Sequence, residues 1–98
     1  MFSDDFTMHH DVAELEPVSN MAPGVQYQLK CRPKFDLRKL KGHPIFVLLK
    51  ADEEIGRFDE YGRIVIVKHW TPEGPVTTGV DSSAKAIQWL LGRDDLAS

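Results

Sequence analysis

Residues 43–70 read HPIFVLLKADEEIGRFDEYGRIVIVKHW and hold the two most strand-like segments of this 98-residue chain. HPIFVLLKA, 43–51, and GRIVIVKHW, 62–70, are rich in β-branched residues and are apolar on both faces for much of their length, which is typical of central strands. EIGRF, 54–58, lies between them and is bounded by short polar connections. The three segments together predict an antiparallel meander.

The segments on either side extend this pattern. TPEGP after the second strand predicts a tight turn, and PVTTGV, 75–80, predicts a further strand. Upstream, VQYQLKC, 25–31, alternates apolar and polar residues, which indicates a half-buried strand. We expect residues 32–43, between these strands, to follow an irregular or one-turn helical path.

The end of the chain has the signature of a helix. Asp81, Ser82 or Ser83 can accept the free N–H groups of a first turn, and Gly92 can end the helix in the left-handed conformation. Trp89 lies well round the helix from the apolar face, so we expect it at the rim of the contact with the sheet or exposed. The residues that share the apolar face are Ala84, Ile87, Leu90 and Leu91.

We therefore predict an α+β fold, with an antiparallel β-meander of about five strands and one C-terminal helix packed on it. A small curled barrel capped by the helix is the alternative form of the sheet. We expect a single domain over residues 23–92. An acidic, loosely ordered arm over residues 1–22 precedes it, and a polar tail over residues 93–98 follows it.

Charge is distributed unevenly along the chain, whose net charge is −3. The first twenty residues hold five acids and no Lys or Arg, whereas KCRPKFDLRKLK, 30–41, holds six basic residues and the single acid Asp36. We call residues 30–41 the basic stretch. Three interpretations stay open: a solvated face neutralised by the acidic arm, a docking strip for an acidic protein surface, or a grip on nucleic acid.

Several classes of function lack support in the sequence. The chain has no apolar run long enough to span a bilayer and no secretory leader at its N-terminus. Its one cysteine excludes an intramolecular disulfide and favours a reducing compartment, so we expect the protein in the cytoplasm. No nucleotide-binding or nucleophile-elbow motif is present, and we expect no cofactor.

Two sets of residues contain atoms suited to chemistry. His9 and His10 lie among acids, but neighbouring histidines point apart in an extended chain, so we expect no metal site. Cys31 could act as a nucleophile with His43 or His69 as its base. It falls on the apolar face of the predicted strand, however, so a buried structural thiol is the expectation.

By exclusion, we expect a small non-enzymatic interaction protein that serves as an accessory, adaptor or inhibitor and binds another macromolecule, in the first instance a protein. Exposed strand edges would also permit a homodimer. The predicted contact residues combine the basic stretch with the two tryptophans, since Arg and Trp concentrate interface energy; they are Arg32, Lys34, Arg38, Lys39, Lys41, Trp70 and Trp89.

Two alternatives belong to other classes. The first is a nucleic-acid-binding module that uses the basic stretch and the sheet, with Trp70 stacking on bases. Its additional residues would be Lys30, Arg57, Arg63 and Lys68. The second is a thiol enzyme that uses Cys31.

Overall fold

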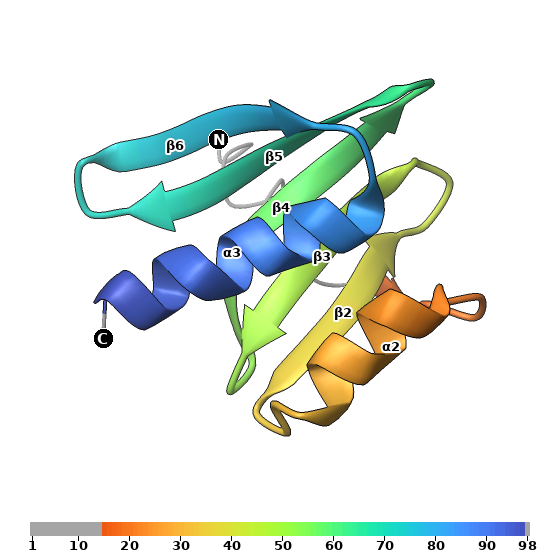
Figure 1. The fold of residues 1–98 in the computed structure, drawn as a ribbon, viewed down its shortest axis with the longest axis horizontal. Helices are drawn as coiled ribbons and strands as arrows, with labels where there is room; N and C mark the ends of the chain where they lie inside the picture. The colour runs from red at the N-terminus through yellow and green to blue at the C-terminus, as the bar shows by residue number, and fades with distance from the viewer. Residues whose placement is uncertain (1–14, 98) are drawn as a thin grey trace, which may run out of the picture.

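A computed structural model describes residues 15–97 of the chain as two helices on one face of an antiparallel sheet (Figure 1). In chain order the elements are β1 (Leu15–Pro17), α2 (Pro23–Lys30), β2 (Phe35–Leu40), β3 (Ile45–Lys50), β4 (Glu53–Tyr61), β5 (Ile64–Thr71), β6 (Gly74–Val80) and α3 (Ser83–Ala97).

The sheet has six strands in the order β1-β2-β3-β4-β5-β6, so each strand pairs with its neighbours in the sequence. The predicted α+β meander with a C-terminal helix is confirmed. The strands number six rather than about five, because β1 and β2 were not predicted as strands, whereas one of the five predicted strands, over residues 25–31, is a helix. Within residues 15–97 the sheet is open: β1 and β6 are its two edges and do not pair with each other, so the barrel alternative is wrong.

Tight turns set the register of the central strands. Lys50 pairs with Glu53 across a turn whose central residues, Ala51 and Asp52, have φ of 51° and 69°. Tyr61 pairs with Ile64 across a turn in which Gly62 has φ of 63°. Left-handed residues at these positions match the right-handed twist of a hairpin, which is why both connections need only two residues.

The hydrophobic core lies between the sheet and the helices. Leu48, Phe58 and Val67 from three strands are at most 1% exposed, as are Ile87 and Leu90 from α3. Burying each such side chain stabilises the fold by about 1.5–3 kcal/mol. The predicted apolar face of α3 therefore packs on the sheet, and the rim position expected for Trp89 is confirmed, since its side chain is half-buried.

The strand predicted over residues 25–31 is wrong, because this segment forms α2. Val25 and Leu29, four residues apart, turn toward the core, whereas Tyr27 is 70% exposed. The same apolar residues thus satisfy a helical period as well as an alternating one. Pro23, in the first turn of α2, favours the helix, since proline lacks the N–H group that a first turn leaves unbonded.

The irregular path predicted for residues 32–43 is also wrong, because residues 35–40 form β2. Phe35 and Leu37 pack toward the helices, while Asp36 and Arg38 face the other way. This alternation is a strand pattern that the density of charge obscured. A strand next to the short edge strand β1 can carry charges, since much of its surface stays in contact with water.

The predicted ends of the domain also change. Helix α3 continues through Gly92 to Ala97, so residues 93–97 are not a polar tail. At the other end, Leu15–Pro17 pairs with β2 as an edge strand, so this part of the predicted arm belongs to the sheet. The remainder of that arm, residues 1–14, lies outside the described residues.

Candidate functional site

Neither of the two helices formed by residues 15–97 covers the second face of the sheet. In β5 the side chains of Val65, Val67 and His69 are buried on the side of α3, so alternate residues of the same strand point to the opposite side. Figure 1 shows both helices in front of the sheet, on the same face. The other face of β4–β6, which we call the open face, presents Arg57, Tyr61, Ile64, Ile66, Lys68 and Trp70.

Large apolar side chains are exposed on the open face. Ile64 is 54% exposed, Tyr61 is 61% exposed and Trp70 is 36% exposed. Toward β2 the same side of the sheet is closed, since Val47, flanked across the strands by Arg38 and Arg57, is 0% exposed. The exposed apolar surface is therefore confined to the half of the sheet that ends at β6.

Trp70 is held in place by a carboxylate and a guanidinium. Its indole Nε1–H donates a hydrogen bond of 2.6 Å to Oε2 of Glu54. The same carboxylate accepts bonds of 2.8 and 2.9 Å from Nε and Nη2 of Arg57, whose Cζ lies 5.8 Å from the centroid of the indole ring. Because both oxygens of Glu54 are bonded, the ring has a fixed orientation before any partner arrives.

A β-bulge in β4 makes this arrangement geometrically feasible. Leu48 pairs with Gly56, but Leu49 pairs with Glu54, so Ile55 is an extra residue in its strand. The extra residue reverses the alternation. Glu54 therefore shares the open face with Arg57, although three residues separate them, while Ile55 packs toward the core.

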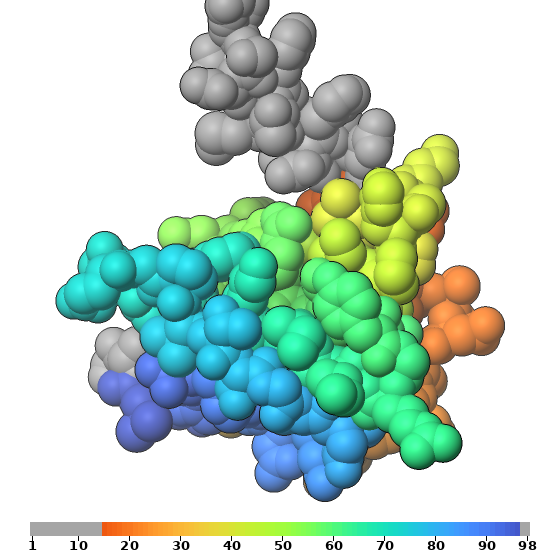
Figure 2. Space-filling model, turned by 90° about the horizontal axis from the view of Figure 1, so that it is seen from above, coloured from red at the N-terminus to blue at the C-terminus, as the bar shows by residue number. Residues whose placement is uncertain are grey.

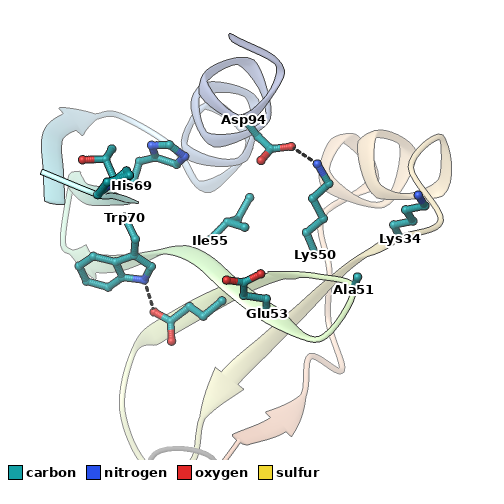
Figure 3. A pocket seen from close by; sticks show the side chains of 11 residues that line it. Lys34, Lys50, Ala51, Glu53, Ile55, His69, Trp70 and Asp94 are labelled. Carbon is teal, nitrogen blue, oxygen red and sulfur yellow. Dashed lines mark hydrogen bonds and ion pairs between the residues drawn. The ribbon is translucent and has the colours of Figure 1, made fainter. Parts of the chain in front are cut away.

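A pocket of about 630 Å³ opens at the end of the sheet beside Trp70 (Figure 3). Lys50 reaches across it and bonds to Asp94 of α3 at 2.8 Å, and Ile55 lies between this ion pair and the indole in the same view. We call this the end pocket. Its lining residues are Lys34, Lys50, Ala51, Glu53, Glu54, Ile55, His69, Trp70, Thr71, Pro72 and Asp94.

His69 is the buried titratable group of this pocket. Its side chain is 6% exposed, its ring meets that of Trp89 edge-on at 6.5 Å, and its Nδ1 has no hydrogen-bond partner among the described residues. Burial lowers the pKa of His69, the positive charge of Arg93 lowers it further, and Asp94 opposes them. The imidazole is therefore neutral at pH 7.

The basic stretch does not form one strip. Arg38 points to the side of the sheet without helices and pairs with Asp36 at 2.8 Å, whereas Lys39 points to the opposite side and lies 3.7 Å from Glu16. Arg32 forms a two-pronged pair with Asp95 of α3, at 2.9 Å for both bonds. Acids of the same chain thus neutralise part of the stretch, but of these acids only Glu16 belongs to the predicted acidic arm.

The other predicted contact residues are dispersed over the molecule. Trp70 and Trp89 lie on opposite sides of the sheet, since Trp89 belongs to α3. The remaining positions are Lys30 in the last turn of α2, Lys34 at the end pocket, Lys41 and Arg63 in turns, and Arg57 and Lys68 on the open face.

The buried thiol predicted at Cys31 is wrong, because Cys31 is exposed at the end of α2. It lines a groove of about 330 Å³ between the helices, whose lining residues include neither His43 nor His69. Residues 15–97 contain no group of three His, Cys, Asp or Glu side chains placed to hold a metal. The candidates His9 and His10 lie outside the described residues.

Two residues of the site were not predicted from the sequence, namely Glu54 and Ile64. The sequence pattern that could have revealed this face is the two-residue spacing of Ile64, Ile66, Lys68 and Trp70 in one strand. The sequence predicts a strand that is buried on both faces, and only the position of the helices shows that one face of β5 is exposed.

No protein-family model, curated protein or solved structure gives a significant match to the chain. Neither helix in the described part of the chain has the length and apolar character needed to cross a bilayer.

Proposed function

We propose that the chain is a small non-enzymatic interaction protein that binds another protein through its open face. The exposed apolar side chains of this face, on the half of the sheet that ends at β6, are the observation that carries the proposal. Exposed apolar side chains grouped on one surface and rimmed by polar residues are typical of interaction sites. Trp70 lies near one end of β5, and Ile64 and Tyr61 lie at its other end, about 20 Å away at the rise of a β-strand. The proposed interface would therefore extend along the strand, with Ile66 and Lys68 between these contacts.

The fixed orientation of Trp70 supports this role. An aromatic anchor that is already held by hydrogen bonds loses little conformational entropy when a partner covers it. Glu54 and Arg57 provide this support, and their side chains are 27% and 22% exposed. A partner would bury the indole without having to reorient it.

The charges on this side of the sheet favour a protein as the partner. The basic groups Arg57 and Arg38 are each paired with an acid, and Asp59 accepts a hydrogen bond from the Tyr61 hydroxyl at 3.0 Å. A surface with both signs of charge suits a partner that is apolar at its centre and mixed in charge at its rim. Nucleic acid binds best to a uniformly positive field.

Nucleic acid is a second candidate partner, because two cations lie beside Trp70 on the open face. Lys68 lies opposite Arg57 across the strands, on the same face as Trp70. A cation beside an exposed aromatic ring can hold a phosphate while a base stacks on the ring.

A capture experiment with paired variants tests the proposal. The full chain is immobilised and exposed to lysate of its native host, with and without nuclease, beside the variant Trp70→Ala/Ile64→Ser. The matched control is Tyr27→Ser/Leu96→Ser, which removes apolar groups that are 70% and 84% exposed on the helices. Each captured protein is then purified and titrated against all three chains.

The proposal expects a nuclease-resistant partner whose affinity falls at least about tenfold in the open-face variant and is unchanged in the control. Equal affinity for the open-face variant and the wild type would contradict it. Loss of the partner after nuclease treatment, with binding that weakens steeply as salt is added, would support the nucleic-acid alternative instead.

A further inference from the structure

Strand β6 is a long edge strand of the sheet, and it pairs with another strand on one side only within residues 15–97. It pairs with β5 along Gly74–Val80, and no other strand within residues 15–97 pairs with it. Figure 2 looks onto this edge, where the cyan and light-blue residues of β6 lie at the surface. The opposite edge differs, since β1 is only three residues long and ends at Pro17.

The turn before β6 determines which backbone groups face outward. Thr71 pairs with Gly74 across two residues, and the closing pair of such a hairpin is hydrogen-bonded. Alternate pairs then bond along the ladder, so Val76 and Thr78 direct their N–H and C=O groups to β5. Thr77 and Gly79 direct theirs away from the sheet.

Pro75 agrees with this assignment. It occupies an outward-facing position and pairs with Trp70, so its missing N–H removes no bond to β5. The outward set therefore comprises the C=O groups of Pro75, Thr77 and Gly79 and the N–H groups of the last two.

Pro75, which lacks one outward N–H group, is the one feature of this edge within residues 15–97 that would hinder strand addition. Residues 74–80 include no charged side chain, and the register between β5 and β6 contains no bulge. Natural edge strands are commonly protected by lysine, by inward-pointing charge, by bulges or by a covering element. An uncharged, regular strand of this length is suited to receive another strand.

We propose that β6 pairs with β6 of a second copy of this chain, antiparallel and around a two-fold axis at Thr77. In this register each Thr77 N–H donates to the Thr77 C=O of the other copy. Each Gly79 N–H donates to the Pro75 C=O, which lies two residues beyond the axis on the other strand. The outward N–H groups of one copy thus meet the outward C=O groups of the other copy, as an isologous interface requires.

Electrostatics also favours a second copy. A charged edge would place like charges opposite each other across the two-fold axis, but here threonine faces threonine. The nearest cation on the open face is Lys68, which pairs with Thr77 in β5. The two copies of Lys68 would be three strand spacings apart, about 14 Å, which is beyond the Debye length at physiological salt.

The dimer would extend one sheet through both copies. The half-buried Val76 and Thr78 would each gain a neighbour from the other copy, and the two open faces would join on the same side. The dimer forms from the isolated protein and does not require the proposed partner-binding function of the open face.

Light scattering coupled to size exclusion, with sedimentation velocity across a concentration series, tests the proposal on the full chain. We expect a species of twice the chain mass of 11.1 kDa. Thr77→Pro removes an outward N–H but no bond to β5, so it should yield a folded monomer. Thr77→Val keeps that N–H and should remain dimeric.

A second variant and a second measurement keep the result clear if the proline variant does not fold. Thr77→Lys places like charges opposite each other and should be monomeric at low salt, with the dimer partly restored at high salt. Amide exchange at Thr77 and Gly79 should slow as the concentration of the wild type rises. A wild type that is monomeric at several hundred micromolar, or dimers of Thr77→Pro and Thr77→Lys as stable as the wild-type dimer, would overturn the proposal.

Discussion

Gly56 of β4 lies directly against Leu90 of α3. A Cβ atom built on Gly56 would approach Cδ2 of Leu90 to 2.6 Å and would lie closer still to the backbone oxygen of Lys68. Glycine therefore lets α3 pack onto the sheet at the centre of the core, and we expect this position to tolerate no side chain.

The substitution Gly56→Ala should lower the free energy of unfolding by about 1–3 kcal/mol, because the added methyl overpacks a filled core. Gly79→Ala is the matched control, since its Cβ would lie 3.8 Å from Ile64 and Ile66, at ordinary contact distance. Urea denaturation measures both. A Gly56→Ala protein as stable as the wild type would show that α3 does not pack at this distance.

Gly92→Ala should instead stabilise the protein by about 0.5–1 kcal/mol. Gly92 lies inside α3, and a Cβ there would meet no atom within 4 Å. Alanine in an unobstructed helical position restricts the unfolded chain and has a better helix propensity. Thermal unfolding followed by circular dichroism checks this result. A decrease in stability would show that the helix ends at Gly92, as the sequence alone suggested.

The protein should become less stable as the pH falls from 7 to 5. Burial and the charge of Arg93 hold the pKa of His69 below its usual value of about 6.5. Below pH 6.5 the imidazole of His69 is protonated in the unfolded chain but stays neutral in the native protein. Protonation therefore stabilises the unfolded state, and the free energy of unfolding decreases as the pH falls toward the native pKa. The slope from this single group cannot exceed about 1.4 kcal/mol per pH unit.

Urea titrations at several pH values measure this slope, and His69→Gln should flatten it over that range. His43→Gln, which replaces an exposed imidazole, is the matched control substitution. A second acid-sensitive group acts at lower pH, because the hydrogen bond with Arg32 lowers the pKa of Asp95. An unchanged slope in His69→Gln would contradict the assignment.

Cys31 should react with iodoacetamide in the folded protein without prior unfolding, because its side chain is exposed at the end of α2. Mass spectrometry of native and urea-unfolded samples should give alkylation rates within about tenfold of each other. Protection of several hundredfold in the native sample would show that the thiol is buried. Native reactivity alone therefore does not indicate catalysis.

The sequence predicted strands β3 to β6 and helix α3, because the apolar residues of these elements follow the period of the structure that they form. The segments around Phe46 and Val67 are rich in β-branched residues, and both lie in interior strands. The apolar face of α3 followed from its spacing. For α2 and β2 the pattern was ambiguous, because Val25 and Leu29 fit either period and the charges around Leu37 obscured its strand alternation.

The candidate site depended much more on the tertiary structure. Trp70 was chosen from the sequence as a contact residue, but its partner Glu54 reaches it through the bulge at Ile55, which shifts the side chains of β4 by one position. The run of charge in the basic stretch predicts one surface, but alternation along β2 places Arg38 and Lys39 on opposite sides of the sheet.

The sequence by itself determined the part of the meander from β3 to β6, its hairpin turns and the helix that follows it, because these depend on periodicity and on residues close in the chain. Which face of the sheet the helices cover, and therefore whether Ile64 is buried or exposed, was decided only by the packing of α2 and α3. That choice depends on the match between surfaces far apart in the sequence, such as Leu90 against Gly56, which local patterns do not specify.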